Sequence, residues 1–191
     1  MMVNPIEAQG LPPEIPAPLP TTMTLEEFLA SDLDDYEYVK GELVPRSATS
    51  LEHGRIGANV CFYLHSYVRE NRLDAMVFVN SGFTVEECVL RPDVAFLSAA
   101  RIPDALRKAS PIPPALAVEV VSPSDKLYSV IEKAFAYLNA GTRLVWVLEP
   151  VAKTVTVYRS ESDFQTFKSP DTLTGEDVID GFSCQVAEFF E

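Results

Sequence analysis

Cysteine is scarce in this sequence of 191 residues: Cys61, Cys88 and Cys184 lie far apart and form no CxxC pair. A disulfide framework or a zinc knuckle is therefore not expected, and a reducing cytoplasm fits this cysteine usage best. No apolar run approaches the roughly 20 residues that a membrane-spanning helix needs, and no basic-then-apolar stretch resembles a secretory signal. We therefore expect a cytoplasmic protein with no membrane partner.

Several catalytic and recognition signatures are also missing. The sequence contains no GxxxxGK[ST] and no GxGxxG, which excludes the usual phosphate-binding loops. Ser122 and Ser124 lack the glycines of a nucleophile elbow, so a serine hydrolase is not expected. His53 and His65, the only histidines, make no metal-ligand pattern; His53 could shuttle protons, although a surface position is the commoner outcome. No helix-turn-helix or zinc-finger signature marks a separate DNA-reading module.

Basic residues are outnumbered, with 15 Lys and Arg against 28 Asp and Glu and a net charge of −13. Taken whole, this balance argues against nucleic acid, because phosphate binding depends on Lys and Arg. The acids are concentrated at the two ends, however. Residues 40–159 hold 14 bases and 12 acids. The middle of the chain can therefore carry a basic groove beside a carboxylate cluster, so charge permits a phosphate-bearing substrate without predicting one.

The sequence indicates a Pro-rich flexible tail over residues 1–22 and a single α/β domain over residues 23–191. Six prolines within residues 1–20 leave no periodicity for a helix or strand. The clearest elements are an amphipathic helix from Leu51 to about Glu70 and a strand–helix–strand unit over 115–148, whose two strands should be parallel. The other predicted elements are a helix from a Thr24 capping box to Ala30, a hairpin turn at Lys40-Gly41, strands over 75–79, 82–86, 88–97 and 154–158, a loop over 101–114, and a terminal turn at 186–190.

One acidic residue stands in an otherwise apolar stretch. Glu119 lies within Leu116-Ala-Val-Glu-Val-Val121, and strand alternation places it on one face with Ala117 and Val121. Burying an unpaired carboxylate is costly, so this side chain should be paired, protonated or bound to a metal. The simpler alternative is an edge strand on which Glu119 points to water.

A second carboxylate, Asp93, lies in Arg91-Pro-Asp-Val-Ala-Phe-Leu97. Pro92 lacks a ladder donor, which suits an edge or a strand start, and a turn aspartate is the simpler interpretation of Asp93 alone. Two carboxylates on neighbouring strands can, however, converge on one oxygen-liganded site. Mg²⁺ binds one or two carboxylates and keeps its other positions for water and phosphate. A backbone carbonyl near Val120 could complete the protein ligands.

The helix that follows Glu119 carries a polar strip of Lys126, Ser129, Lys133 and Tyr137. Because this helix packs back on the sheet, Lys133 can reach the carboxylates, where an ammonium could orient a metal-bound water or offset charge in the transition state. A solvated lysine paired with a nearby acid is at least as good an interpretation. The residues predicted to form the buried stripe of this helix are Leu127, Val130, Ile131, Ala134, Phe135 and Leu138.

Six short segments occur in a fixed order: Tyr38-Val-Lys-Gly-Glu-Leu-Val44, Leu51-Glu-His-Gly-Arg-Ile56, Arg91-Pro-Asp-Val-Ala-Phe96, Ala117-Val-Glu-Val-Val-Ser-Pro-Ser-Asp125, Glu132-Lys133 with Tyr137, and Ala140-Gly-Thr-Arg-Leu-Val-Trp-Val-Leu-Glu-Pro150. Their order and spacing resemble the Uma-two family of restriction endonucleases, within the PD-(D/E)xK nuclease superfamily. The resemblance runs from about Met23 to Phe190.

The resemblance implies a restriction-endonuclease-like core, with a mixed central β-sheet flanked by α-helices. It also implies Mg²⁺-dependent hydrolysis of DNA phosphodiesters, with Mn²⁺ as a possible substitute. The PD of the motif falls on Pro92-Asp93 and its second acid on Glu119. The lysine slot two residues later holds Val121, and the family's lysine on the following helix matches Lys133, with Lys126 as the alternative.

Further expectations come from the same resemblance. Glu42 and Glu52 match upstream acidic positions that could add a ligand or hold water. DNA is the expected partner and a homodimer the expected assembly, because cutting two strands usually needs two sites. A nuclease-fold protein that binds or assembles without cutting is the alternative, motivated by the negative charge and by Ser129 at a position where relatives carry an acid. A small-molecule hydrolase that uses the same two carboxylates is a more distant alternative, because nothing in the sequence indicates a substrate pocket for it.

Overall fold

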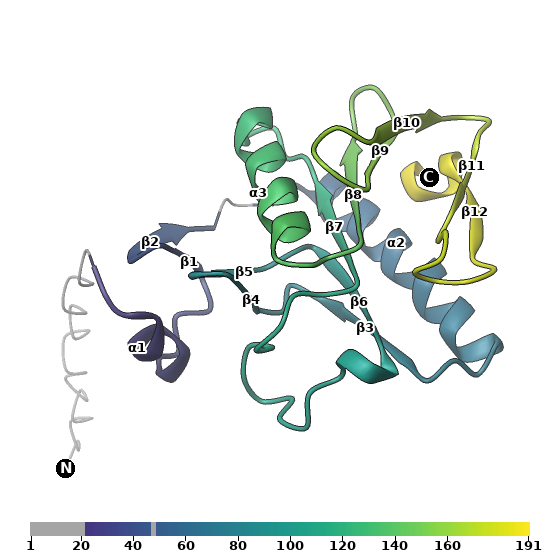
Figure 1. Ribbon diagram of the computed structural model, residues 1–191. Coiled ribbons are helices and arrows are strands. Elements are labelled where there is room, and N and C mark those ends of the chain that lie inside the picture. Colours follow the sequence, from purple (N-terminus) through teal and green to yellow (C-terminus); the bar gives the residue numbers. More distant parts are fainter. Residues whose placement is uncertain (1–21, 47–48) are drawn as a thin grey trace, which may run out of the picture.

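The computed structural model describes residues 22–46 and 49–191 (Figure 1). The predicted tail lies outside the described residues except for Thr22, and its separation from a single domain stays a prediction. The helices are α1 (Leu25–Ala30), α2 (Leu51–Glu70) and α3 (Leu127–Asn139), with two 3₁₀-helices, η1 (Ala99–Arg101) and η2 (Val186–Phe190). The strands are β1 (Tyr36–Val39), β2 (Glu42–Pro45), β3 (Ala75–Val79), β4 (Phe83–Val85), β5 (Cys88–Leu90), β6 (Val94–Ser98), β7 (Leu116–Val120), β8 (Leu144–Glu149), β9 (Thr154–Tyr158), β10 (Phe164–Lys168), β11 (Thr172–Thr174) and β12 (Ser183–Gln185). None of the helices in these described ranges is long and apolar enough to cross a membrane.

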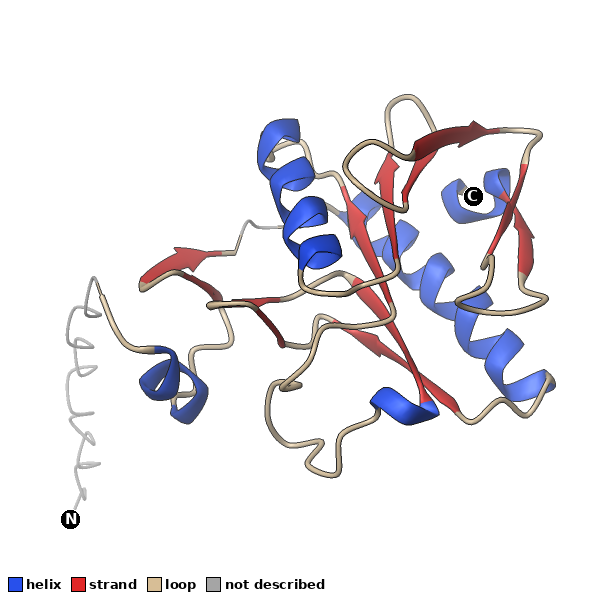
Figure 2. Ribbon diagram, viewed as in Figure 1, coloured by secondary structure: helices blue, strands red, loops and turns tan. Residues whose placement is uncertain are grey.

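A mixed sheet of six strands, in the order β10-β9-β8-β7-β6-β3, forms the centre of the molecule (Figure 2). Strands β7 and β8 are parallel, with Glu119 opposite Val147. The other neighbouring pairs of this sheet are antiparallel. The predicted parallel strand–helix–strand unit and the mixed central sheet are therefore confirmed.

The two longer helices cover opposite faces of this sheet (Figure 1). Ile56, Val60 and Leu64 of α2 are fully buried against one face, where η2 and the chain after β10 complete the core. Val130 and Ala134 of α3 pack on the other face. Alternation along β7 divides its side chains between these two cores, which places Glu119 on the same side as α3.

A smaller sheet of four strands, in the order β2-β1-β5-β4, lies beside the α3 face of the central sheet. The predicted turn joins its first two strands: Lys40 and Gly41 both have positive φ, at 48° and 98°, as a two-residue hairpin turn requires. The helix α1 begins at the predicted capping box, in which the Thr24 hydroxyl accepts from the Glu27 N–H at 3.2 Å. Phe28 then packs against Tyr38 and anchors α1 on the small sheet.

The segment 88–97 is two strands in different sheets, not the single strand that the sequence predicted. Strand β5 pairs with β1 and β4 in the small sheet, whereas β6 pairs with β3 and β7 in the central sheet. Pro92 has no N–H to donate to a ladder, and the chain crosses from one sheet to the other at this point. Asp93 consequently lies at the junction of the two sheets.

The predicted orientation of α3 is partly wrong. Leu127, expected in the buried stripe, is 53% exposed, whereas Tyr137, placed in the polar strip, is fully buried. A buried carboxylate on β7 needs donors, and α3 turns part of its polar strip toward the sheet to supply them. The acidic C-terminal part also contains strands β10, β11 and β12, which were not predicted from the sequence.

Candidate active site

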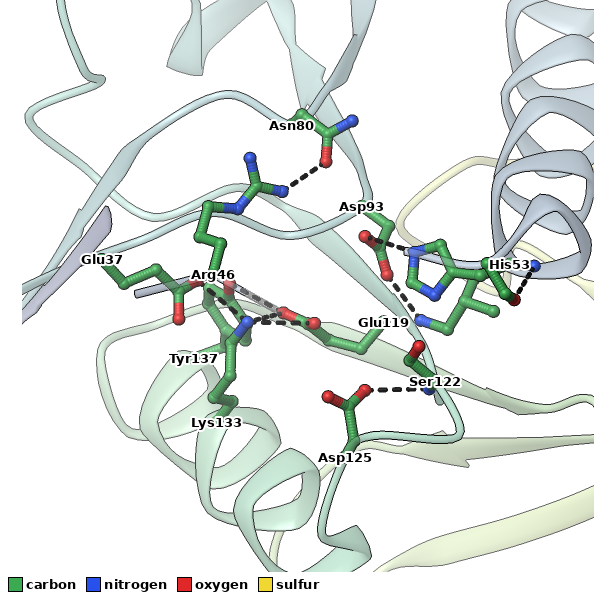
Figure 3. Close-up of polar contacts among 12 residues, drawn as sticks. Glu37, Arg46, His53, Asn80, Asp93, Glu119, Ser122, Asp125, Lys133 and Tyr137 are labelled. Atoms are coloured by element: carbon green, nitrogen blue, oxygen red, sulfur yellow. Dashed lines mark hydrogen bonds and ion pairs between the residues drawn. The ribbon is translucent and has the colours of Figure 1, made fainter. Parts of the chain in front are cut away.

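Glu119 is buried beneath α3 and bonded to two of its side chains (Figure 3). The Lys133 Nζ lies 2.9 Å from Glu119 Oε1 and 3.1 Å from Oε2. The Tyr137 hydroxyl donates to Oε1 at 3.0 Å. Lys133 and Tyr137 are four residues apart and so lie on one face of the helix, one turn apart. The edge-strand alternative for Glu119 is thereby excluded.

A third carboxylate, from the small sheet, completes the surroundings of Lys133. Glu37 lies on β1 and its Oε1 is 2.9 Å from Lys133 Nζ. The same oxygen accepts from the backbone N–H of Arg91 at 2.8 Å. One ammonium thus joins a carboxylate of each sheet, which ties the small sheet to the central one through α3.

Asp93 is held by contacts to both of its carboxylate oxygens. His53 Nε2 lies 3.0 Å from Oδ1, and the Val120 N–H donates to Oδ2 at 2.8 Å. The second bond connects Asp93 to the residue that follows Glu119, so the two carboxylates are fixed beside each other. His53 comes from the first turn of α2 and is 7% exposed, so the surface position that the sequence favoured is wrong.

These groups, apart from the fully buried Tyr137, line a cleft of about 870 Å³ between the small sheet, α3 and the loop that follows β7. The cleft is open to solvent and lined by both signs of charge. Its cationic lining residues are Lys40, Arg46, Arg91, Lys126 and Lys133. Arg46 reaches across toward the central sheet and donates to Asn80 Oδ1 at 2.6 Å. Carboxylates line the same cleft, among them Glu86, Asp125 and Glu132, so its lining is mixed in charge and the basic groove that the charge distribution permitted stays a prediction.

Burial and the closeness of several carboxylates shift the pKa values of Glu119, Lys133 and Tyr137. Loss of hydration, together with the charges of Asp93 and Glu37, raises the pKa of Glu119 to about 7 despite the attraction of Lys133. Burial lowers the pKa of Lys133, but Glu119 and Glu37 outweigh it and leave that pKa raised. Burial and the same two carboxylates raise the pKa of Tyr137 well above its ordinary value, so Tyr137 stays a hydroxyl donor.

We expect the raised pKa of Glu119 to make the metal-free protein less stable as pH rises from about 4.5 to about 7. The unfolded chain loses this proton near the ordinary value of 4.5, whereas the folded protein keeps it until about 7. The folded state therefore binds more protons in this window, and its stability falls as they leave. Glu119→Gln cannot titrate, so the difference in Tm between variant and wild type should shift in favour of the variant over this window. Thermal melts in EDTA measure it, and a difference that is constant with pH would contradict the raised pKa.

The donors of this site suit a hard divalent cation. Within the described ranges no group of three or more His, Cys, Asp or Glu side chains is arranged to hold a metal. Asp93 and Glu119 offer carboxylate oxygens, the type of donor that Mg²⁺ takes from proteins, one or two at a time, beside water and phosphate. Each carboxylate has about four acceptor positions and uses only some of them here. A nearby cation would also favour the ionised form of Glu119, whose pKa is raised by burial and by the neighbouring carboxylates.

The structure brings three of the predicted site residues together and leaves others apart. Asp93, Glu119 and Lys133 meet at the cleft. At Val120 the contact present is its N–H to Asp93, and a metal-binding role for its carbonyl stays a prediction. Glu42 and Glu52 are exposed and are not part of the cleft lining, and a role for either also stays a prediction.

Two polar residues of the site were not predicted from the sequence. Glu37 lies between the aromatic residues of Tyr36-Glu-Tyr38, where alternation gives no sign that it is buried. His53 had a usable signal, because it precedes Ile56, Val60 and Leu64 on the buried stripe of α2. A histidine in register with an apolar stripe is expected to find a polar partner inside the protein.

The fold and the cleft together define a class: α/β proteins with a mixed central sheet, helices on both faces, and carboxylates and a lysine gathered at one end. A chain from Anabaena variabilis ATCC 29413, described as a putative nuclease belonging to DUF820, has this fold, with a TM-score of 0.77 and 23% sequence identity over 88% of this chain and 97% of that one. Residues 25–187 match the Uma2 family, described as "Putative restriction endonuclease", and the chain belongs to that family. No curated protein sequence matches the chain.

Proposed function

We propose that the protein is a metal-dependent endonuclease that hydrolyses DNA phosphodiester bonds, with Asp93 and Glu119 holding Mg²⁺ and Lys133 assisting the attacking water. The observation that carries the proposal is that these three side chains line one cleft, although they come from three separate segments of the chain. Family membership supports it at the coarser level of a nuclease.

The bound cation would supply Lewis acidity at the phosphate and would lower the pKa of a water in the cleft. The protein side chains provide the rest. The Val120 N–H holds the Asp93 carboxylate against β7, and His53 ties its other oxygen to α2. Tyr137 donates to Glu119 Oε1, and Lys133 lies close to both oxygens of this carboxylate. These contacts fix the two oxygen ligands before a substrate arrives, which avoids reorganisation during the reaction.

Lys133 is suited to a role at the phosphate. Its ammonium lies 2.9 Å from both Glu37 and Glu119, so it stays protonated and its position is fixed. A fixed ammonium can donate to a water or to a phosphate oxygen on which negative charge accumulates in the transition state. Glu37 would keep Lys133 in place when Glu119 shares its negative charge with a bound cation.

The test is a nicking assay with supercoiled plasmid and with single-stranded DNA. We expect cleavage in Mg²⁺ or Mn²⁺ and none in excess EDTA. Calorimetry of the DNA-free protein should show divalent-ion binding that the Asp93→Ala, Glu119→Ala double variant lacks. DNA binding without cleavage in either metal would instead support a nuclease-fold protein that binds but does not cut.

Cleavage of both strands would need two such clefts, and we propose a homodimer as the assembly that supplies them. Light scattering after gel filtration, with and without a short duplex, measures the oligomeric state. A monomer in both conditions would restrict the proposal to nicking of one strand.

A further inference from the structure

We propose that Arg91 is a phosphate-binding residue of the cleft, that Asp34 occupies it in the free protein, and that a DNA strand displaces Asp34 when it binds. This inference rests on the proposed function, because it names where a phosphate of the substrate is held. The inference adds that Asp34, a residue of the same chain, competes with the DNA phosphate for Arg91.

Arg91 lies close to Asp93 and Lys133, two of the proposed catalytic residues. It lies two residues before Asp93, where the chain crosses between the two sheets, and its side chain lines the same cleft. Its backbone N–H donates to Glu37 Oε1 at 2.8 Å, the oxygen that also holds Lys133. An anion bound by Arg91 would therefore lie at a fixed place relative to Asp93 and Lys133.

The guanidinium of Arg91 has an unused donor. Its side chain is only 14% exposed, and its Nε is buried with no hydrogen-bond partner among the described residues. A buried donor without a partner is costly, and a ligand or a water that accepts from it would remove that cost. Arginine binds phosphate through two parallel N–H bonds, and Nε with one terminal nitrogen forms such a pair of donors.

The present partner of Arg91 is easily replaced. Asp34 Oδ1 accepts from Arg91 Nη2 at 2.8 Å, and the Asp34 side chain is 85% exposed. An exposed ion pair of this kind contributes about 0.2–1 kcal/mol. A phosphodiester should bind Arg91 more strongly than Asp34 does, because it can accept from two donors and because its binding releases counterions from the DNA. Lys133, by contrast, is held by two buried carboxylates and is not free to exchange.

The experiment measures binding of a fluorescein-labelled single-stranded oligonucleotide by anisotropy in EDTA, over roughly 50 to 200 mM salt. Asp34→Asn should tighten binding by about 1.4- to 5-fold, the fold-change that corresponds to loss of an exposed ion pair. Arg91→Ala should weaken binding and reduce the salt slope by about one phosphate contact. The double variant should bind like Arg91→Ala alone, because Asp34 then has nothing to block.

The matched control is Asp35→Asn, which removes the same charge from the next residue, also exposed. Equal tightening in Asp34→Asn and Asp35→Asn would reduce the effect to overall charge and overturn the proposal, as would an unchanged salt slope in Arg91→Ala. Asp34 is on the surface, so the Asn variant tests the idea even if Arg91→Ala does not fold. Wild-type protein that cleaves DNA while these variants bind alike would refute this inference alone. Wild-type protein that neither binds nor cleaves DNA would refute the proposed function and this inference together.

Discussion

Nicking of supercoiled DNA should fall by about 10²- to 10³-fold in Asp93→Asn and in Glu119→Gln. Each substitution keeps the shape of the side chain and most of its hydrogen bonds, including the acceptor oxygen for Tyr137 in the second case. Each removes one anionic ligand where a divalent ion and a developing negative charge must be balanced. Single-turnover rates at saturating Mg²⁺ measure the loss in the chemical step and separate it from weaker DNA binding.

The matched control is Glu132→Gln, a cleft carboxylate on the exposed side of α3 next to Lys133. It changes the charge of the cleft by the same amount without touching the buried group. Full activity in both Asp93→Asn and Glu119→Gln would remove the catalytic assignment. A comparable loss in Glu132→Gln would show that the effect comes from cleft charge rather than from the two proposed ligands.

Lys133→Met should have the second largest effect, because it should lower both the free energy of unfolding and the nicking rate. It leaves Glu37 and Glu119 buried at neutral pH without the ammonium that lies 2.9 Å from each. Removing one partner of a buried ion pair costs about 3–5 kcal/mol, and the partial exposure of Lys133 places the expected loss toward the lower end. Urea unfolding with equal m-values measures the change in the free energy of unfolding.

A double variant tests the physical reason for that loss. Adding Glu119→Gln to Lys133→Met removes one of the two unpaired carboxylates and should recover part of the stability. Strictly additive losses would contradict the buried pairing. Lys126→Met is the control, an exposed residue just before the same helix, with an expected change within about 0.5 kcal/mol. Nicking by Lys126→Met also decides which of the two lysines assists the reaction.

Much of the fold follows from patterns in single segments. The apolar stripe from Ile56 to Val68 and the apolar run around Glu119 each predict one element, and the structure contains both. The sequence shows that Pro92 lacks an N–H to donate to a sheet, but it does not show that the chain changes from one sheet to the other at this residue. Whether a chain continues in one sheet or changes to another depends on which strands are available as partners, and that information lies far away in the sequence.

The site was predictable only where one residue contradicts its surroundings. Glu119 was conspicuous because a carboxylate inside an apolar strand demands a partner. Nothing local marks Glu37, and the only local sign for His53 is its register with the apolar stripe of α2. Their burial results from the docking of the small sheet and of α2 beside Asp93, which is a tertiary event.

The contacts of Lys133 with Glu37 and Glu119, which join the two sheets, can form only after α3 has been synthesised. Glu37 and Asp93 are synthesised before Lys133, and at ordinary translation speed roughly 5 to 20 seconds separate residue 37 from residue 133. During that interval the small sheet has no ammonium against which to dock Glu37. A nascent chain that stops before α3 would thus present unneutralised acids where the finished protein has its cleft, and the amino-terminal half can reach its final place only late in synthesis.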